Sequence, residues 1–377
     1  MKGIRMSGVP KNWSVVLALF LIATLMVSCD CGTEPPPPND GPDSTSHDFT
    51  WRQDTLGDRT YQSIPQGIWG SAPDNVYAVG HSSSYVTGKI WHWDGLTWTD
   101  ISIKYTEALP GESLLFTPAA AFGFGSNDVW IAGYRDTTYP PQPIKQGFVM
   151  HYDGTKWHGV SPPNAQNLYA MWGSSSSDMW VGGINGGLHH FNGSVWEDYT
   201  VADSIWIESF AGMLNGRLIA GGLSHNDTTG RTYYHLLEWD GVTWQVSESV
   251  LDDGAGTPFY VNVQVIGGQL YSPSYQSVMR RVTTGSWQTV FSDPQNTFLD
   301  VGGDAANNLF VVGWSGVIYH FDGNEWIHYD QFSNAKVDNL GIWVGGGHVF
   351  ITSEEIFSQG SPWPKSFIIR GAPKSGG

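Results

Sequence analysis

One phrase recurs along this chain, and its recurrence limits the possible folds more than any other feature of the sequence. It joins an apolar stretch, a turn rich in Gly, Ser and Asp, and a second stretch of the type Val-Trp-x-Val-Gly. A unit of this size cannot bury its own apolar face, so neighbouring units must stack on one another. The sequence therefore predicts a repeat protein of seven units. The clear copies are residues 68–80, 122–133 and 171–183, and the weaker copies are 210–222, 265–272, 301–313 and 343–352.

A second phrase, which ends in tryptophan, follows each of the first six copies, as in IWHWDGLTW at 90–98. The seventh copy ends as SFIIRG at 366–371 without a tryptophan, whereas Trp51 has no copy before it. Trp51 therefore completes the series, whose mean spacing of about 46 residues is that of a propeller blade. The series is Trp51, Trp98, Trp157, Trp196, Trp244, Trp287 and Trp326. We expect these tryptophans to pack one blade against the next.

Each unit carries four short strand signals. Asp-Gly or Asn-Gly joins the third and fourth of them in most units, and this pair is the strongest short signal for a hairpin. Four antiparallel strands in 40–50 residues are typical of one blade. We therefore predict an all-β, seven-bladed β-propeller over residues 49–371, with the N-terminal strand around Trp51 closing the last blade and protecting its edge.

The repeats resemble the tryptophan-rich propeller repeats of bacterial envelope lipoproteins. More distantly they are similar to the Asp-box propellers of sialidases and to the photosystem assembly-factor propellers. The sialidase box has one residue between Asp and Gly, whereas here the two are adjacent, as in Asp94-Gly95 and Asp322-Gly323. The resemblance covers residues 49–371 and implies the fold. It implies no activity, because propellers carry many unrelated functions.

The first residues are typical of a targeting segment. Basic residues precede an apolar run at 14–27 that is short for a membrane span, and the run ends in Met-Val-Ser before Cys29. This ending resembles the lipobox of bacterial lipoproteins, so we expect a signal peptide at 1–28 and lipid attachment at Cys29. An ordinary cleaved signal peptide with an incidental cysteine is the alternative. The Pro-rich residues 29–48 then form a tether, and 372–377 a disordered tail. The expected location is the bacterial cell envelope, at the outer membrane, the cell surface or the periplasmic side.

Composition excludes several classes of protein. The formal net charge is −17, which would repel a nucleic acid. Aromatic residues make up 14% of the chain, which argues against disorder. No glycine-rich phosphate loop or catalytic signature is present, so we expect no cofactor and a monomeric propeller.

Four histidines stand at equivalent positions, two residues before the Asp-Gly or Asn-Gly turn, and invite a metal hypothesis: His92, His151, His190 and His320. Equivalent positions in different blades diverge around a ring, so they cannot bind one ion, and we expect a packing role and no metal. A Ca²⁺ site in the acidic loop 252–256 stays open as an alternative, although the loop lacks the EF-hand spacing.

Function is expected where the repeats differ. The loops between second and third strands, and those between blades, share one face and vary in length, and we name this the variable-loop face. The turns on the opposite face are short and regular, and we name it the short-turn face. Variable loops on a rigid scaffold usually carry binding residues. The predicted binding residues are Tyr134, Arg135, Tyr139, His225, Arg231 and Trp314.

Two functions compete at this stage. The first is a non-enzymatic module that binds a protein or a glycan on the variable-loop face. The second is a glycan-active enzyme with carboxylates on the variable-loop face, which would need two of them beside a pocket, at least one with a raised pKa. We expect the first, and therefore no catalytic residue.

Overall fold

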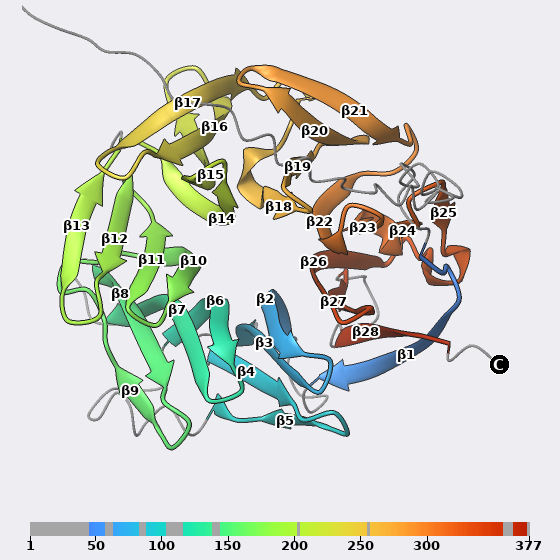
Figure 1. Ribbon diagram of the computed structural model, residues 1–377, viewed down its shortest axis with the longest axis horizontal. Helices are drawn as coiled ribbons and strands as arrows, with labels where there is room; N and C mark the ends of the chain where they lie inside the picture. The colour runs from blue at the N-terminus through green and yellow to red at the C-terminus, as the bar shows by residue number, and fades with distance from the viewer. Residues whose placement is uncertain are drawn as a thin grey trace, which may run out of the picture. The chain divides into compact units, whose positions relative to one another are not determined.

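Seven four-stranded antiparallel sheets surround a common axis (Figure 1). The computed structural model describes residues 45–56, 63–82, 88–102, 116–137, 144–201, 204–254, 257–356 and 365–374. All of the described residues lie in one compact unit, 41–377. The predicted fold class, a seven-bladed β-propeller, is confirmed.

In the first six blades the strand order in space follows the order in the chain, from the innermost strand outward. The first blade comprises β2 (Ser63–Ala72), β3 (Asn75–Ser82), β4 (Gly88–Trp93) and β5 (Trp98–Asp100). The second comprises β6 (Phe116–Gly125), β7 (Asp128–Thr137), β8 (Ile144–Tyr152) and β9 (Trp157–Gly159). The third comprises β10 (Leu168–Ser175), β11 (Asp178–Gly183), β12 (Gly187–Phe191) and β13 (Trp196–Thr200). The fourth blade comprises β14 (Trp206–Leu214), β15 (Arg217–Asn226), β16 (Arg231–Trp239) and β17 (Trp244–Leu251). The fifth comprises β18 (Gln264–Ile266), β19 (Gln269–Pro273), β20 (Ser277–Thr283) and β21 (Ser286–Ser292). The sixth comprises β22 (Phe298–Ala305), β23 (Asn308–Gly313), β24 (Ile318–Phe321) and β25 (Trp326–His328).

The seventh blade is assembled from both ends of the described chain. Its inner strands are β26 (Val337–Gly345), β27 (His348–Glu355) and β28 (Ser366–Pro373), and its outermost strand is β1 (Phe49–Leu56). Strands β1 and β28 pair antiparallel, with Trp51 opposite Gly371. Strand β28 runs to Pro373, so the predicted tail at 372–377 begins too early, because Ala372 pairs with Thr50.

Asp-Gly turns join the third and fourth strands as the sequence predicts. In the first blade the Asp94 carboxylate accepts hydrogen bonds from the backbone N–H groups of Leu96 and Thr97, at 2.9 and 2.8 Å. These backbone hydrogen bonds hold the pKa of Asp94 below its usual range. Gly95 follows with φ +91°, which a residue with a Cβ rarely adopts. The turns at Asp153, Asp240 and Asp322 repeat the pattern.

The outer-strand tryptophans pack each blade against the preceding one, as predicted. The Trp326 ring stacks on Phe291 of the fifth blade with 4.6 Å between centroids. Trp51 meets Tyr329 of the sixth blade edge-on at 4.8 Å. Aromatic rings bury large apolar areas and prefer such edge or offset contacts. The series of outer-strand tryptophans therefore has a structural role.

Residues 45–48 lie against the sixth blade. The Thr45 N–H donates to the Asp322 carbonyl at 2.8 Å, and the Tyr329 hydroxyl donates to the His47 carbonyl at 2.9 Å. The His47 and His320 rings meet edge-on, with their Nδ1 atoms 2.9 Å apart. The described end of the predicted tether is thus part of the propeller, because its backbone has partners there. No helix in the described part of the chain is long and apolar enough to cross a membrane.

Candidate functional site

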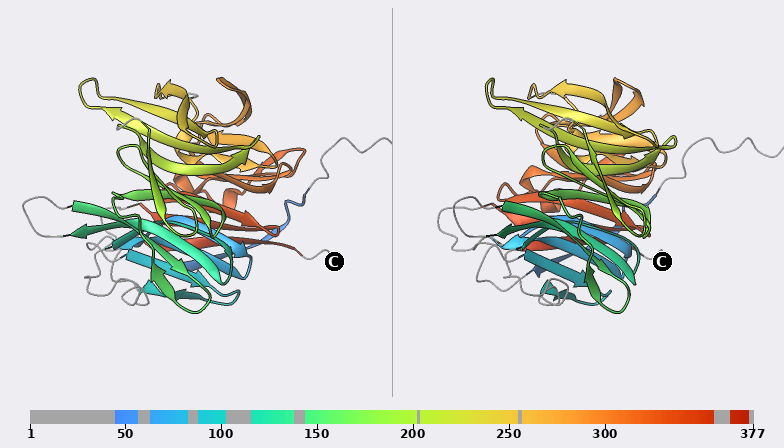
Figure 2. Two further views of the ribbon diagram at one scale, coloured as in Figure 1. Left: turned by 60° about the vertical axis from the view of Figure 1, so that its left-hand side comes forward. Right: turned by 90° about the vertical axis from the view of Figure 1, so that its left-hand side faces the viewer.

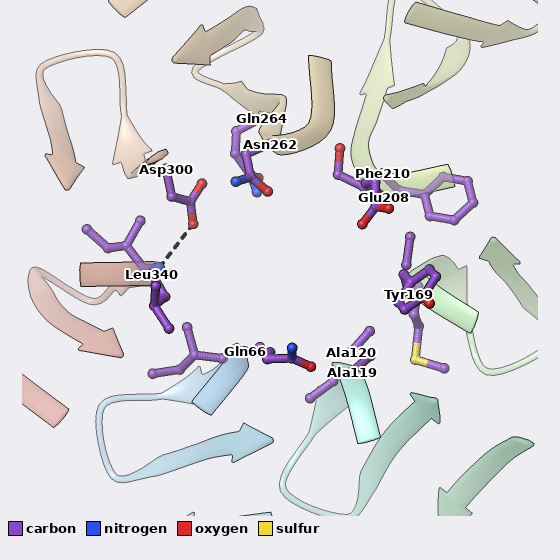
Figure 3. A pocket seen from close by; sticks show the side chains of 18 residues that line it. Gln66, Ala119, Ala120, Tyr169, Glu208, Phe210, Asn262, Gln264, Asp300 and Leu340 are labelled. Atoms are coloured by element: carbon purple, nitrogen blue, oxygen red, sulfur yellow. Dashed lines mark hydrogen bonds between the residues drawn. The ribbon is translucent and has the colours of Figure 1, made fainter. Parts of the chain in front are cut away.

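The inner strands enclose a cavity of about 370 Å³ at the centre of the ring (Figure 3). All seven blades contribute to its wall, each through the first half of its inner strand or the residues just before it. The loops between blades lead into these strand starts, so the cavity lies at the end of the ring that carries the variable-loop face. The lining includes Gln66, Ala119, Tyr169, Glu208, Asn262, Gln264, Asp300 and Leu340.

A recurring β-bulge shapes this wall. In six blades the pairing between the first and second strands slips by one residue near the start of the first strand, as between Ile207 and Ser209 in β14. A bulge leaves one residue unpaired and redirects its side chain. Five of the six extra residues line the cavity, namely Gln66, Ala119, Tyr169, Glu208 and Leu340. The sixth, Leu299 in β22, is not among the lining residues.

Glu208 differs from the other acid of the site because it has no hydrogen-bond partner among the described residues. Its carboxyl points into the cavity from β14 (Figure 3). Burial raises the pKa of this carboxyl to about 7. Desolvation disfavours the ionised form when no donor or cation compensates it. Near neutral pH Glu208 can therefore hold a proton or act as an anionic acceptor.

Asp300 lies in the same wall but has partners. Its two carboxylate oxygens accept the backbone N–H groups of Val301, at 2.9 Å, and of Ile342 in the seventh blade, at 3.1 Å. Burial raises its pKa to about 7, although both N–H donors act in the opposite direction. The residues at this register position in five other blades are small and uncharged: Gly67, Ala120, Ala170, Ser209 and Gly341. Asp300 thus joins two blades and lines the cavity at once.

Similar links join neighbouring blades beside it. Asn262 donates from its side-chain amide to the Leu299 carbonyl at 2.7 Å, from the fifth blade to the sixth. Ser209 accepts the Val263 N–H at 3.4 Å, from the fifth blade to the fourth. A buried backbone N–H or C=O group without a hydrogen-bond partner destabilises the folded protein. The side chains of Asn262 and Ser209 supply such partners, so they have a structural role. Within the described ranges Glu208 has no such link, so it is the acid of this wall that can meet a ligand.

One of the predicted binding residues, Tyr134, contacts a residue of the cavity wall, and Arg135 follows it in the same strand. Tyr134 and Arg135 belong to β7 and not to a loop, because the pairing with β8 continues as far as Thr137 and Ile144. The Tyr134 ring meets Tyr169 edge-on, with 5.7 Å between centroids. Arg135 donates from Nη2 to the Gln146 side chain at 2.6 Å. Tyr134 therefore supports a lining residue without lining the cavity itself.

The other predicted residues lie elsewhere on the propeller. His225 and Arg231 are exposed residues at the tip of the β15–β16 hairpin, not in an irregular loop, since the ladder runs to the pair Asn226–Arg231. This hairpin and the ends of β7 and β8 project on the same side of the ring (Figure 2). Trp314 begins a short 3-10 turn, η3 (Trp314–Gly316), in the sixth blade, and is 48% exposed. Cys29 and Tyr139 lie outside the described residues.

The repeated histidines link strands within a blade. His151 bonds Asp128 through Nε2 at 2.8 Å and stacks on Trp130 with 4.1 Å between centroids. His92, His190 and His320 form the equivalent hydrogen bond, to Asn75, Asp178 and Asn308 respectively. Across the described ranges no three His, Cys, Asp or Glu side chains gather as a metal site would require.

The acidic loop that was a Ca²⁺ candidate is described as far as Gly254. Asp252 accepts hydrogen bonds from the hydroxyls of Tyr234 and Tyr275, at 3.2 and 3.1 Å. Asp253 accepts one from the Thr257 hydroxyl at 2.5 Å. Both carboxylates thus brace the loop, and the Ca²⁺ hypothesis remains untested.

Comparison with known proteins identifies the fold. No family model and no curated protein sequence matches the chain. Among solved structures, YCF48 bound to a D1 peptide superposes with a TM-score of 0.58 at 13% identity, covering 85% of this chain and 96% of that one. YCF48 from Cyanidioschyzon merolae gives 0.57 at 15%, with 86% and 99% covered. An inactive virginiamycin B lyase from Staphylococcus aureus, with quinupristin, gives 0.54 at 12%, with 85% and 99% covered. At these identities the likeness shows that the chain is a β-propeller, and shows nothing of its activity.

Proposed function

We propose that this chain is a lipid-anchored protein of the bacterial envelope whose propeller binds a protein or glycan partner on the variable-loop face, without catalysis. One observation carries the proposal. The cavity lies at that end of the ring, and a recurring bulge aims non-repeated side chains such as Tyr169 and Glu208 into it. A cavity wall whose side chains differ from blade to blade can recognise one particular ligand. The repeated residues cannot, because equivalent positions diverge around the ring.

Two further observations support the proposal. A propeller of similar fold, YCF48, has been solved with a bound D1 peptide, which illustrates that this scaffold can bind a peptide. The hairpin carrying His225 and Arg231 projects beyond the ring on the same side as the ends of β7 and β8. The envelope anchor rests on the lipobox-like sequence before Cys29, which lies outside the described residues.

Capture from an envelope extract tests the proposal. The protein is immobilised through residues 29–48 and exposed to the extract and, in parallel, to a glycan array. We expect a discrete partner that is lost when Tyr134, Arg135, Tyr139, His225, Arg231 and Trp314 are changed to Ala. The matched control changes Leu96 and Val242, exposed residues of short turns on the other face, to Ala. Loss of the partner in the control alone would reject the variable-loop face.

A glycan-active enzyme is the second candidate, because two carboxyls with raised pKa line one cavity. Glycoside hydrolysis needs two such groups facing each other across about 5–9.5 Å. Against this, Asp300 already accepts two backbone hydrogen bonds. Release of reducing sugar from envelope polysaccharides, abolished in a Glu208→Gln, Asp300→Asn double variant, would establish the enzyme and overturn the first proposal.

A further inference from the structure

The central cavity presents charge of one sign. Two of the described residues that line it carry carboxyls, Glu208 and Asp300, and none of them is Lys, Arg or His. The other titratable lining group is the phenol of Tyr169, and three side-chain amides complete the polar wall: Gln66, Asn262 and Gln264. With no basic group in the described wall, the field of the carboxylates favours a cation.

The two acids differ in what they can offer to a ligand. The Asp300 oxygens face backbone N–H donors at 2.9 and 3.1 Å, so their strongest acceptor directions are occupied. The Glu208 carboxyl faces the centre of the cavity (Figure 3). Glu208 is half-buried and has no hydrogen-bond donor in the part of the chain that the structure describes, so it gains most from a ligand that brings one. Glu208 is therefore the primary counter-ion for an entering cation, and Asp300 contributes at longer range.

The rest of the wall suits a stem without charge. Ala119, Ala120, Phe210 and Leu340 line the cavity between the polar groups. A lysine side chain has this character, because its methylene chain packs on apolar surface while its ammonium seeks an acceptor. The volume of about 370 Å³ lies near the lower end for ligand pockets, which favours one side chain over an oligosaccharide.

We propose that the central cavity binds the cationic side chain of a peptide segment of the partner, with Glu208 as its counter-ion. This inference deepens the proposed function and rests on it for the peptide nature of the ligand. A lysine ammonium is the best match, since it is compact, and arginine is the other source of the same charge.

Binding should depend on pH in a definite direction. The Glu208 pKa of about 7 means that the carboxyl is largely protonated at pH 6 and largely ionised at pH 8. The pKa of Asp300, which faces the same space, is raised in the same way, and Tyr169 adds only a phenol. A cation prefers the ionised carboxyls, so its affinity should increase from pH 6 to pH 8, and binding at pH 7 should release protons.

The test uses small probes on the full-length protein. Nα-acetyl-lysine methylamide is compared by NMR titration with the norleucine analogue, which keeps the stem and lacks the charge. The arginine analogue and glucosamine are the further arms. The variant is Glu208→Gln, and the control is Glu197→Gln, which removes an exposed carboxyl on β13. Calorimetry in two buffers of different ionisation enthalpy measures the proton release.

We expect the lysine probe to bind and the norleucine probe to bind at least about tenfold more weakly, since a hydrogen bond to a charged group is worth about tenfold or more. Glu208→Gln should lose a similar factor, and Glu197→Gln none. Equal binding of the lysine and norleucine probes by the unmodified protein would overturn the inference, whether or not the variant folds. Binding of glucosamine alone would reject the peptide in favour of a glycan.

The probe titration and the capture experiment together separate this inference from the proposed function. If envelope partners are captured on the variable-loop face while no cationic probe binds, the inference fails and the proposed function stands. If the lysine probe binds through Glu208 but no partner is captured, the proposed function fails and the cation preference of the cavity stands.

Discussion

Replacing Glu208 by Gln should stabilise the propeller at alkaline pH and leave it unchanged at acidic pH. In the folded protein burial raises the pKa of Glu208 from 4.5 to about 7. Below pH 4.5 the carboxyl is neutral in the folded and the unfolded chain, so it has no pH-dependent effect. Between the two values the folded protein holds a proton that the unfolded chain releases, so stability falls as pH rises. Above pH 7 the folded protein bears the full cost of an ionised buried carboxyl.

The size of this cost follows from the two pKa values. Each tenfold change in proton affinity is about 1.4 kcal/mol, so the cost approaches about 3 kcal/mol at pH 8. At about 2 °C per kcal/mol for a domain of this size, the Gln variant should melt roughly 6 °C above the unmodified protein at pH 8. At pH 4.5 the two proteins should melt together.

The assay is thermal unfolding of both proteins between pH 4 and pH 8.5, followed by circular dichroism. Other titrating groups, including Asp300, are present in both proteins and cancel in the difference. A melting difference that does not vary with pH would refute the argument, because a packing effect alone has no reason to follow the ionisation of Glu208.

Three further predictions follow from other parts of the propeller. Deleting residues 49–56 should lower the melting temperature by roughly 10 °C or more, because it removes the outer strand of the seventh blade together with the Trp51 contacts; an unchanged melting curve would contradict closure by β1. Burial lowers the pKa of His320 to about 3, so below pH 6.5 the unfolded chain binds a proton that the folded protein does not bind; stability should fall by about 2 kcal/mol from pH 6.5 to 4.5, and His320→Gln should flatten this fall in a melting series. Cys29→Ala should move the protein from the detergent phase to the soluble fraction, and continued partitioning into detergent would argue against a lipid anchor.

The sequence predicts the architecture because a period of about 46 residues repeats the same packing problem seven times. Trp51 and Trp326 show this most clearly, since each packs its blade against an aromatic ring of the preceding blade. The extent of the loops is predicted less well. Tyr134 and Arg135 precede a Pro-rich stretch that is typical of a loop, yet their strand keeps its partner as far as Thr137. A hydrogen-bonded ladder can continue through residues of weak strand propensity when its partner strand is already in place.

Neither acid of the cavity is predicted from the sequence, although the sequence carries a signal for Asp300. Asp300 stands where five other blades have Gly, Ala or Ser, and Glu208 sits at a bulge that only the pairing with β15 reveals. An exception to a repeat indicates function in an inner strand as well as in a loop, so the comparison of blades points to Asp300. The direction of Glu208 depends on a register slip that no local pattern encodes.

Photo-crosslinking in living bacteria tests the central claim most directly, namely that the variable-loop face meets a partner. A photoreactive amino acid is placed at His225 or Trp314 on that face, and at Leu96 or Val242 on the short turns, all of which are exposed. We expect a discrete crosslinked species from the first two positions and none from the second two. The same crosslinked species from Leu96 or Val242 alone would contradict the claim.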